Sequence, residues 1–199
     1  MIVLVFTGGT ISMRHDPEVR GAIPALAGQV ILDLVPQLND LGTLEIDDFG
    51  AYPGPHMTAE RMWELRERIE RHLARPEVTG VVVTHGTDSL EESAYLVARS
   101  LQSSKPVVFT GAMRTSSDLG WDGPSNLSAS IRVAASEEAR GFGVLVVMSD
   151  RFYAGLDVTK VHTHLLDAFE SPGLGPLGVV DGRRVIFRRA IPEPCSVVD

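Results

Sequence analysis

The sequence predicts an α/β fold built on a parallel β-sheet. Four short segments are almost continuously apolar and rich in β-branched residues, as are strands that are buried on both faces of a parallel sheet. Segments of helix length separate them, and this alternation is typical of a parallel sheet covered by helices. With 44% apolar residues in a chain of 199, the sequence can also bury a sizeable core.

The strands are predicted from their β-branched runs. The four strongest segments are residues 2–6, 80–84, 106–110 and 143–148. Residues 44–48 form a weaker candidate strand. Near the end of the chain, Asp181-Gly182 is a hairpin-turn signal, and it predicts a further strand over residues 184–188.

Three segments carry helix signals. Residues 58–74 open with Thr58, a suitable N-cap, and then repeat apolar residues at intervals of three or four. Residues 89–101 open with Ser89-Leu90-Glu91-Glu92, which is typical of a capping box. Residues 124–139 begin with Pro124, which suits the first turn of a helix.

Composition excludes several classes of protein. The 18 Lys and Arg against 26 Asp and Glu give a net charge of −8, which disfavours binding to nucleic acid. No apolar run approaches the length of a membrane span, so we expect no membrane partner. A single cysteine, Cys195, excludes an internal disulfide and a Cys-rich zinc site. The residues after Met1 lack the features of a secretory leader, which predicts a cytoplasmic protein.

Three polar clusters follow predicted strands. They are Thr7-Gly8-Gly9-Thr10, Thr84-His85-Gly86-Thr87-Asp88 and Asp157-Val158-Thr159-Lys160. Ligands of open α/β sheets bind beyond the carboxyl ends of the strands, so these clusters are expected to share one site.

The residue types in these clusters suit nucleophilic catalysis. Thr10, Thr87, Asp88 and Lys160 would supply a nucleophile, a second hydroxyl, an orienting carboxylate and a base. Glycines beside Thr10 would let backbone N–H groups approach a substrate oxygen. Each residue also has a purely structural interpretation: a tight turn at Gly8-Gly9, a helix cap at Asp88, a surface ion pair at Lys160. Lysine is scarce, however, because Lys105 and Lys160 are the only two.

These segments together resemble the bacterial-type L-asparaginases. Thr7-Gly8-Gly9-Thr10-Ile11 and Thr84-His85-Gly86-Thr87-Asp88 look like the two signatures of that family. Four further segments resemble the family: Gly111-Ala112-Met113-Arg114, Asp122-Gly123-Pro124-Ser125-Asn126-Leu127, Asp157-Val158-Thr159-Lys160 and Gly175-Pro176-Leu177-Gly178. The resemblance runs in order from residue 1 to about residue 190. The resemblance implies a three-layer sandwich of the asparaginase N-terminal domain type. It assigns residues 1–190 to that catalytic domain and residues 191–199 to a linker-like tail, without the family's usual C-terminal domain.

The resemblance also implies a mechanism. Thr10 would attack the side-chain amide of free asparagine and form an acyl-enzyme, with release of ammonia. Thr87, Asp88 and Lys160 match the family's threonine–aspartate–lysine set, and Asp88 also matches its ligand for the substrate α-amino group. The backbone of Ala112 would lie near the leaving amide. The family is oligomeric, which implies a homo-oligomer, and this threonine chemistry needs no cofactor or metal.

The sequence departs from the family pattern in three places. Residues 11–30 contain no counterpart of the lid tyrosine, and His15 is the only aromatic ring there. The segment Pro53-Gly54-Pro55-His56-Met57 lacks the serine that holds the substrate α-carboxylate, although a backbone N–H of Gly54 or His56 could replace it. The Pro-rich end, Pro192-Glu193-Pro194, is typical of a linker and points to a natural short form or a truncated chain.

The substrate-binding candidates are therefore Gly9, Gly54, Pro55, His56, Gly86 and Ala112. Four functions stay open: an asparaginase, a hydrolase of another small amide, an isolated domain with little or no activity, and the amidotransferase subunit that makes glutaminyl-tRNA. The pair His162 and His164 could form a metal clip, but no third ligand is near them in the sequence, and loop histidines are commoner.

Overall fold

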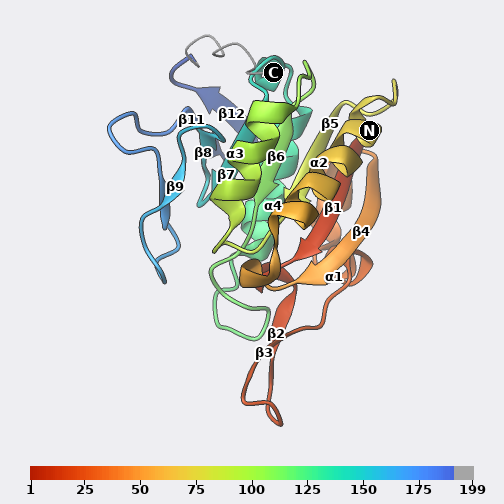
Figure 1. The fold of residues 1–199 in the computed structure, drawn as a ribbon, viewed down its shortest axis with the longest axis vertical. Coiled ribbons are helices and arrows are strands. Elements are labelled where there is room, and N and C mark those ends of the chain that lie inside the picture. Colours follow the sequence, from red (N-terminus) through yellow and green to blue (C-terminus); the bar gives the residue numbers. More distant parts are fainter. Residues whose placement is uncertain (191–199) are drawn as a thin grey trace.

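The sheet at the centre of the molecule has eight strands in the order β12-β11-β8-β7-β6-β5-β1-β4 (Figure 1). The computed structural model describes residues 1–190. The parallel strands are β1 (Ile2–Gly8), β4 (Leu44–Tyr52), β5 (Gly80–Thr84), β6 (Val107–Thr110) and β7 (Val144–Met148). The antiparallel strands are β8 (Arg151–Ala154), β11 (Gly178–Asp181) and β12 (Arg184–Phe187).

Helices cover both faces of this sheet, which confirms the predicted three-layer α/β sandwich. The four helices are α1 (Gly28–Leu34), α2 (Ala59–Leu73), α3 (Leu90–Ser100) and α4 (Gly123–Ala135). Alternate residues of β1 face opposite layers: Leu4 packs in the apolar cluster of α1 and α4, while Val5 packs in that of α2 and α3. Both side chains are fully buried, as expected for a strand that helices cover on both faces.

All the predicted strands are present, and the five expected in the parallel sheet are parallel, but β8, β11 and β12 add antiparallel pairs that make the sheet mixed. A turn at Ser149 and Asp150, with φ of 51° and 59°, reverses the chain directly after β7. Strand β8 therefore pairs antiparallel to β7, and Met148 faces Arg151 across the turn. Two non-glycine residues form this turn, so the usual Asn-Gly or Asp-Gly signal is absent and β8 was not predicted. The predicted hairpin turn at Asp181-Gly182 does join β11 to β12.

One predicted helix cap and one predicted helix end are wrong. Thr58 does cap α2, because its hydroxyl accepts a hydrogen bond from the backbone N–H of Arg61. Ser89, in contrast, forms no capping box, because its hydroxyl donates to the carbonyl of Gly54 at 2.7 Å. Helix α4 ends at Ala135, and Ser136 caps a separate 3₁₀ turn instead of continuing the helix to residue 139.

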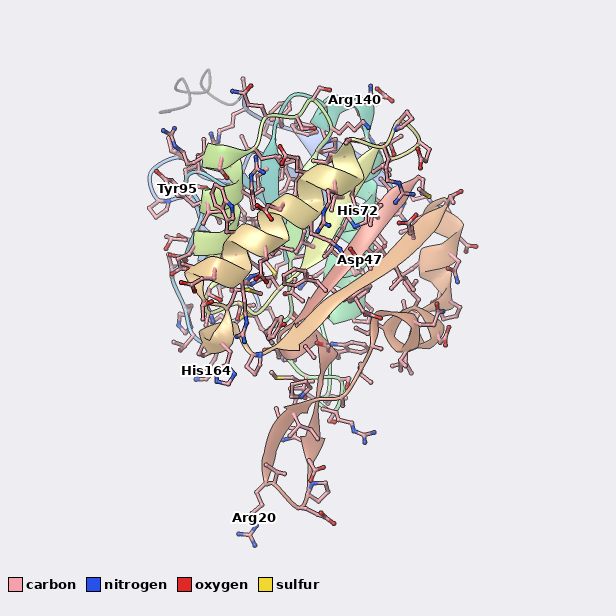
Figure 2. The ribbon with its side chains drawn as sticks, turned by 45° about the vertical axis from the view of Figure 1, so that its right-hand side comes forward. Arg20, Asp47, His72, Tyr95, Arg140 and His164 are labelled. Atoms are coloured by element: carbon pink, nitrogen blue, oxygen red, sulfur yellow. The ribbon has the colours of Figure 1, made fainter. Side chains whose placement is uncertain are left out.

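Smaller elements lie around the sheet. A hairpin of β2 (Met13–Asp16) and β3 (Gly21–Pro24) projects from the body, with Arg20 at its tip (Figure 2). The two-residue strands β9 (Thr159–Lys160) and β10 (Phe169–Glu170) form a second small sheet. The 3₁₀ turns are Thr10–Ser12, Pro36–Leu41, Gly54–His56 and Glu137–Ala139. The predicted tail at residues 191–199, with Cys195, lies outside the described residues.

An ionic cluster ties α2 to the edge strand β4. Asp47 and His72 point toward one another in Figure 2, with Oδ2 of Asp47 2.6 Å from Nε2 of His72. Arg68 donates to the same carboxylate. Burial acts to raise the pKa of Asp47, but the hydrogen bonds from Arg68 and His72 outweigh it and hold this pKa below its ordinary value. Within residues 1–190, no helix is long and apolar enough to cross a membrane.

Candidate active site

The site lies where three neighbouring parallel strands end. Gly9 and Thr10 follow β1, Gly54 follows β4, and the segment 86–88 follows β5. Strands β4, β1 and β5 are adjacent and parallel, so their carboxyl ends lie at one edge of the sheet. The first two polar clusters predicted from the sequence therefore meet there.

Glycines make this meeting possible. A β-carbon on Gly9 would lie 2.5 Å from Cα of Gly86, and one on Gly86 would lie 2.6 Å from Cα of Gly54. Gly9 also has a φ of 77°, which side-chain-bearing residues rarely adopt. The three backbones are therefore in direct contact, and Gly54 in turn packs against Asp88.

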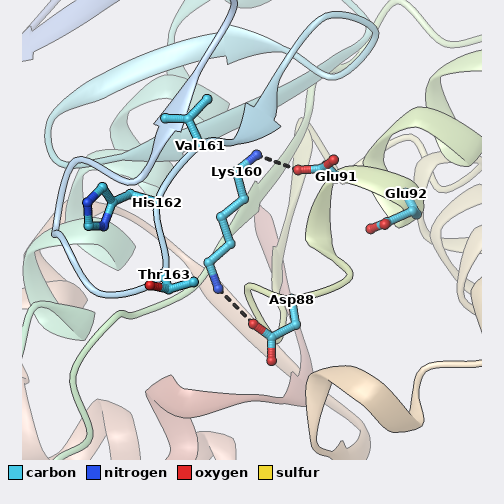
Figure 3. Close-up of a pocket in the computed structure, with 7 residues that line it drawn as sticks. All are labelled: Asp88, Glu91, Glu92, Lys160, Val161, His162 and Thr163. Atoms are coloured by element: carbon cyan, nitrogen blue, oxygen red, sulfur yellow. Dashed lines mark hydrogen bonds and ion pairs between the residues drawn. The ribbon is translucent and has the colours of Figure 1, made fainter.

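Lys160 joins the third cluster to the second. Its Nζ lies 2.9 Å from Oγ1 of Thr87 and 2.7 Å from Oδ1 of Asp88, as Figure 3 shows for Asp88. Thr87 is buried, and only 14% of the Lys160 side chain is exposed, whereas 61% of Asp88 is exposed. Because the ammonium donates to Oγ1, the hydroxyl proton of Thr87 points elsewhere and can be given to another group.

An open pocket of about 430 Å³ adjoins these residues. Its walls come from the start of α3, with Asp88, Glu91 and Glu92, and from β9 with the loop that follows it (Figure 3). Lys160 is the one amine among three carboxylates in this lining. A small zwitterionic or cationic molecule suits such a charge distribution better than an anion does.

His85 supports the segment 86–88 through a hydrogen bond to Gly86. It is completely buried, and burial lowers its pKa to about 4, so the ring is neutral at neutral pH. Nδ1 lies 2.9 Å from the carbonyl oxygen of Gly86, and Nε2 lies 2.8 Å from Oγ of Ser93. A carbonyl can only accept, so Nδ1 carries the proton and Nε2 accepts from the Ser93 hydroxyl. No sequence pattern predicted a role for His85 or Ser93.

The loop after β6 brings Ala112 to the same edge. Ala112 is fully buried, and a β-carbon on the preceding Gly111 would lie 3.1 Å from Cγ2 of Thr87. Asp122 accepts hydrogen bonds from the backbone N–H groups of Met113 and Arg114, and Asn126 donates to the Gly111 carbonyl. This supporting role of Asp122 and Asn126 was not predicted from the sequence. Its signal is Asp122, the acidic residue directly before Gly123, at which α4 begins.

The other predicted residues are less tightly involved. Thr10 is half-buried at the start of a 3₁₀ turn, directly after Gly9. Pro55 and His56 are exposed, and the backbone N–H of His56 donates to the Pro53 carbonyl at 2.9 Å. Asp157, expected beside Lys160, instead accepts hydrogen bonds from Ser171 and Arg189. Metal-binding groups of three or more His, Cys, Asp or Glu are absent from residues 1–190, so His162 and His164 have no third ligand there.

Within residues 11–30, which lack a counterpart of the lid tyrosine, the structure has the β2–β3 hairpin. His15 on β2 is exposed, and its Nε2 lies 3.6 Å from Oδ1 of Asp118. Its backbone N–H donates to Oγ of Ser117, and the N–H of Ser116 donates to the Met13 carbonyl. The hairpin is thus attached at its base to the loop 115–118, and His15 makes its surface contacts from a strand and not from the exposed loop that such a residue suggests.

Comparison with known proteins decides the family. Residues 1–193 match the model described as "Asparaginase, N-terminal". The chain belongs to this family. It is 37% identical to L-asparaginase 2 of Bacillus subtilis over 183 residues, which cover 90% of the chain and 48% of the relative. It is 38% identical to a probable L-asparaginase of Deinococcus radiodurans, over 97% of the chain and 59% of the relative.

A solved structure supports the same assignment. The probable cytoplasmic L-asparaginase of Campylobacter jejuni superposes with a TM-score of 0.88 at 33% identity, over 97% of the chain and 58% of that protein. A 36% identical relative from Acinetobacter glutaminasificans is named a glutaminase-asparaginase. The resemblance inferred from the motifs is thus confirmed, and so is the fold. The chain spans about half the length of the curated relatives it matches.

Proposed function

We propose that the chain is an amidohydrolase that converts L-asparagine to L-aspartate and ammonia. One observation carries the proposal: the amine of Lys160 donates hydrogen bonds to both Thr87 and Asp88. These residues lie at the edge of the sheet where β1 ends and Thr10 follows. Membership in the asparaginase family supports the same chemistry. Residues 1–190 are then the catalytic domain, and no cofactor or metal takes part.

The reaction has two steps. In the first, Oγ1 of Thr10 attacks the side-chain amide carbon, an ester forms, and the amide nitrogen leaves as ammonia after taking up a proton. In the second, water attacks the ester, aspartate leaves, and Thr10 regains its proton. In each step the neutral amine of Lys160 takes up, through Thr87, the proton that leaves the attacking hydroxyl or water, and the resulting ammonium returns that proton through Thr87 to the departing group.

The remaining residues bind the substrate. Oδ2 of Asp88 accepts no hydrogen bond from residues 1–190, so it can accept the substrate α-ammonium group. The closely packed backbones of Gly9 and Gly86 let the amide approach Thr10, and the loop of Ala112 borders the leaving nitrogen. Gly54, Pro55 and His56 form the side of the site where the α-carboxylate would bind.

That side of the site favours a second candidate, the hydrolysis of another small amide. Pro55 has no donor, and the N–H of His56 is engaged with Pro53, so this segment offers few groups to an α-carboxylate.

A homo-oligomer is part of the proposal on family grounds. A cytoplasmic location is supported by the name of the Campylobacter jejuni relative, although a Haemophilus influenzae relative is named as periplasmic.

The test is ammonia release by the purified 199-residue chain from L-asparagine, L-glutamine and other small amides. We expect release from asparagine and a loss of about 10³-fold or more in Thr10→Ala. Thr43→Ala is the matched control, because this exposed threonine lies at the amino end of β4, whereas the site lies at the carboxyl ends of the strands. Full activity in Thr10→Ala would contradict the threonine mechanism, and release only from another amide would establish the second candidate.

A further inference from the structure

Glu91 connects the strand that carries Lys160 to helix α3. Its Oε1 lies 2.9 Å from Oγ1 of Thr159, and its Oε2 accepts the backbone N–H of Lys160. Figure 3 shows this contact beside the bond from Lys160 to Asp88. One carboxylate thus holds two consecutive residues of β9.

This connection matters because little else fixes β9. The strand has two residues, and it pairs with β10, which is equally short, in a sheet separate from the central one. Glu91 lies in the first turn of α3, a few residues after Thr87 and Asp88. The same chain segment therefore holds Lys160 at both ends: the Nζ through Thr87 and Asp88, and the backbone N–H through Glu91.

We propose that Glu91 is a positioning residue for Lys160. Its carboxylate fixes the hydroxyl of Thr159 and the backbone of Lys160. The backbone of Lys160 is thereby held at a position from which the amine of its flexible side chain reaches Thr87. The catalytic consequence rests on the proposed amide hydrolysis, whereas the positioning itself does not depend on it.

A comparison with Glu92 distinguishes the positioning role of Glu91 from a general interaction of a carboxylate with the helix dipole. Any carboxylate in the first turn of a helix interacts favourably with the helix dipole, and both Glu91 and Glu92 stand there. Both also line the pocket, but within residues 1–190 the Glu92 side chain makes no hydrogen bond to β9. Glu92→Ala is therefore the matched control, since it removes a charge from the same turn and leaves β9 attached.

Substitutions of Glu91 separate hydrogen bonding from charge. Glu91→Ala removes both acceptors. Glu91→Gln keeps the shape: its amide oxygen accepts the Lys160 N–H, and its amide nitrogen donates to the Thr159 hydroxyl, which can also accept. A positioning role predicts that Glu91→Gln keeps the position of Lys160 and that Glu91→Ala loses it.

The readout is the NMR signal of the lysine side chains, in the full chain with ¹³C-labelled lysine. The chain has two lysines, so each ε-methylene is resolved, and Lys160→Arg assigns them. Lys105, whose amine donates to the carbonyls of Leu73 and Arg75, is the internal reference. We expect two distinct ε-proton shifts for Lys160 in the parent, Glu91→Gln and Glu92→Ala chains, and one averaged signal in Glu91→Ala.

Two results would overturn the proposal: an unchanged Lys160 signal in Glu91→Ala, or an equal collapse in Glu92→Ala. If Glu91→Ala unfolds, so that the Lys105 signal collapses too, Thr159→Val takes its place. It removes one of the two bonds and keeps the side-chain shape. We then expect partial averaging for Lys160, and an unchanged Lys160 signal overturns the proposal.

A kinetic arm tests the catalytic consequence. For asparagine hydrolysis we expect kcat to fall about 10- to 100-fold in Glu91→Ala, as for a reacting group displaced by about 1 Å, with a much smaller change in KM. Glu91→Gln should recover most of this loss, and an equal loss in Gln and Ala would contradict positioning. If no variant and no parent chain hydrolyses any amide, the proposed function fails, while the NMR comparison still decides the role of Glu91.

Discussion

Nζ of Lys160 lies 2.7 Å from Oδ1 of Asp88, although 72 positions separate the two residues in the chain. The pair is asymmetric, because the lysine side chain is 14% exposed and the aspartate side chain is 61% exposed. Ion pairs with one well-solvated partner add little to stability. The contact therefore orients the amine toward Thr87 more than it stabilises the fold.

We therefore expect Lys160→Met to change activity and not folding. Ammonia release should fall by about 10³-fold, while the free energy of unfolding changes by less than about 1 kcal/mol. Lys105→Met is the matched control and should show the reverse, because Lys105 satisfies two carbonyls at the end of α2 and lies away from the site. Parallel kinetics and urea unfolding measure both quantities. A large loss of stability in Lys160→Met would contradict this division of roles.

Gly86→Ala should separate the two loops of the site. The added β-carbon would lie 2.6 Å from Cα of Gly54 and 2.7 Å from its N, both backbone atoms that cannot turn aside. We expect at least about a 10²-fold loss of ammonia release, because displacement of Thr87 by about 1 Å is enough to cause it. At Gly21, the nearest atom to a new β-carbon is 3.9 Å away, so Gly21→Ala should keep full activity. Equal activities of the two variants would show that the tight glycine contact is not needed.

Asn126→Ala should loosen the loop that carries Ala112. Asn126 is buried and donates to the Gly111 carbonyl and to Asp122, and it accepts the backbone N–H of Ser149. Its removal leaves buried polar groups unpaired, which costs about 1–3 kcal/mol of unfolding free energy. The neighbouring exposed Ser125 gives the control Ser125→Ala, with a change of less than about 0.5 kcal/mol. Chemical denaturation compares the two, and an unfolding free energy of Asn126→Ala within 0.5 kcal/mol of the parent would show that these bonds add nothing.

Patterns that depend on neighbours in the chain were predicted well. The run 80–84 has the bounds of β5, because β-branched residues buried on both faces leave little choice of structure. Lys160 was identified because lysine is scarce and this one follows a hydroxyl-rich segment. Its contact with Thr87 and Asp88 then followed from the rule that strand ends meet at one edge of a sheet.

Contacts between distant segments were not predictable in the same way. Ser89 has the sequence of a capping residue, but the carbonyl of Gly54 competes for its hydroxyl, and no local pattern reveals that competitor. Asp157 stands three positions before Lys160, yet it pairs with Ser171 and Arg189. Glu91 was given no role of its own within the predicted capping box Ser89-Leu90-Glu91-Glu92, because an acidic residue in a first helical turn already has a local explanation.

The titration of His85 makes stability depend on pH above the range of the carboxylates. Burial lowers the pKa of His85 to about 4 from an ordinary value of 6.5. Below pH 6.5 the unfolded chain binds a proton on His85 that the folded chain does not. The free energy of unfolding should therefore fall as the pH drops from 6.5 toward 4, by about 3 kcal/mol in total. Above pH 6.5 this residue should add no pH dependence.

Urea unfolding between pH 7.5 and 5 measures this slope, and it stays above the pH range in which Asp47 and Glu45 gain protons, because the pKa values of both are lowered. We expect His85→Asn to be less stable at every pH, since it loses the bond to Ser93, but to have a flatter slope from pH 6.5 downward. His164→Gln replaces an exposed histidine and should keep the parent slope. If His85→Asn also keeps that slope, the ring is protonated in the folded state at pH 5, and its Nδ1–H and Nε2 assignments must be revised.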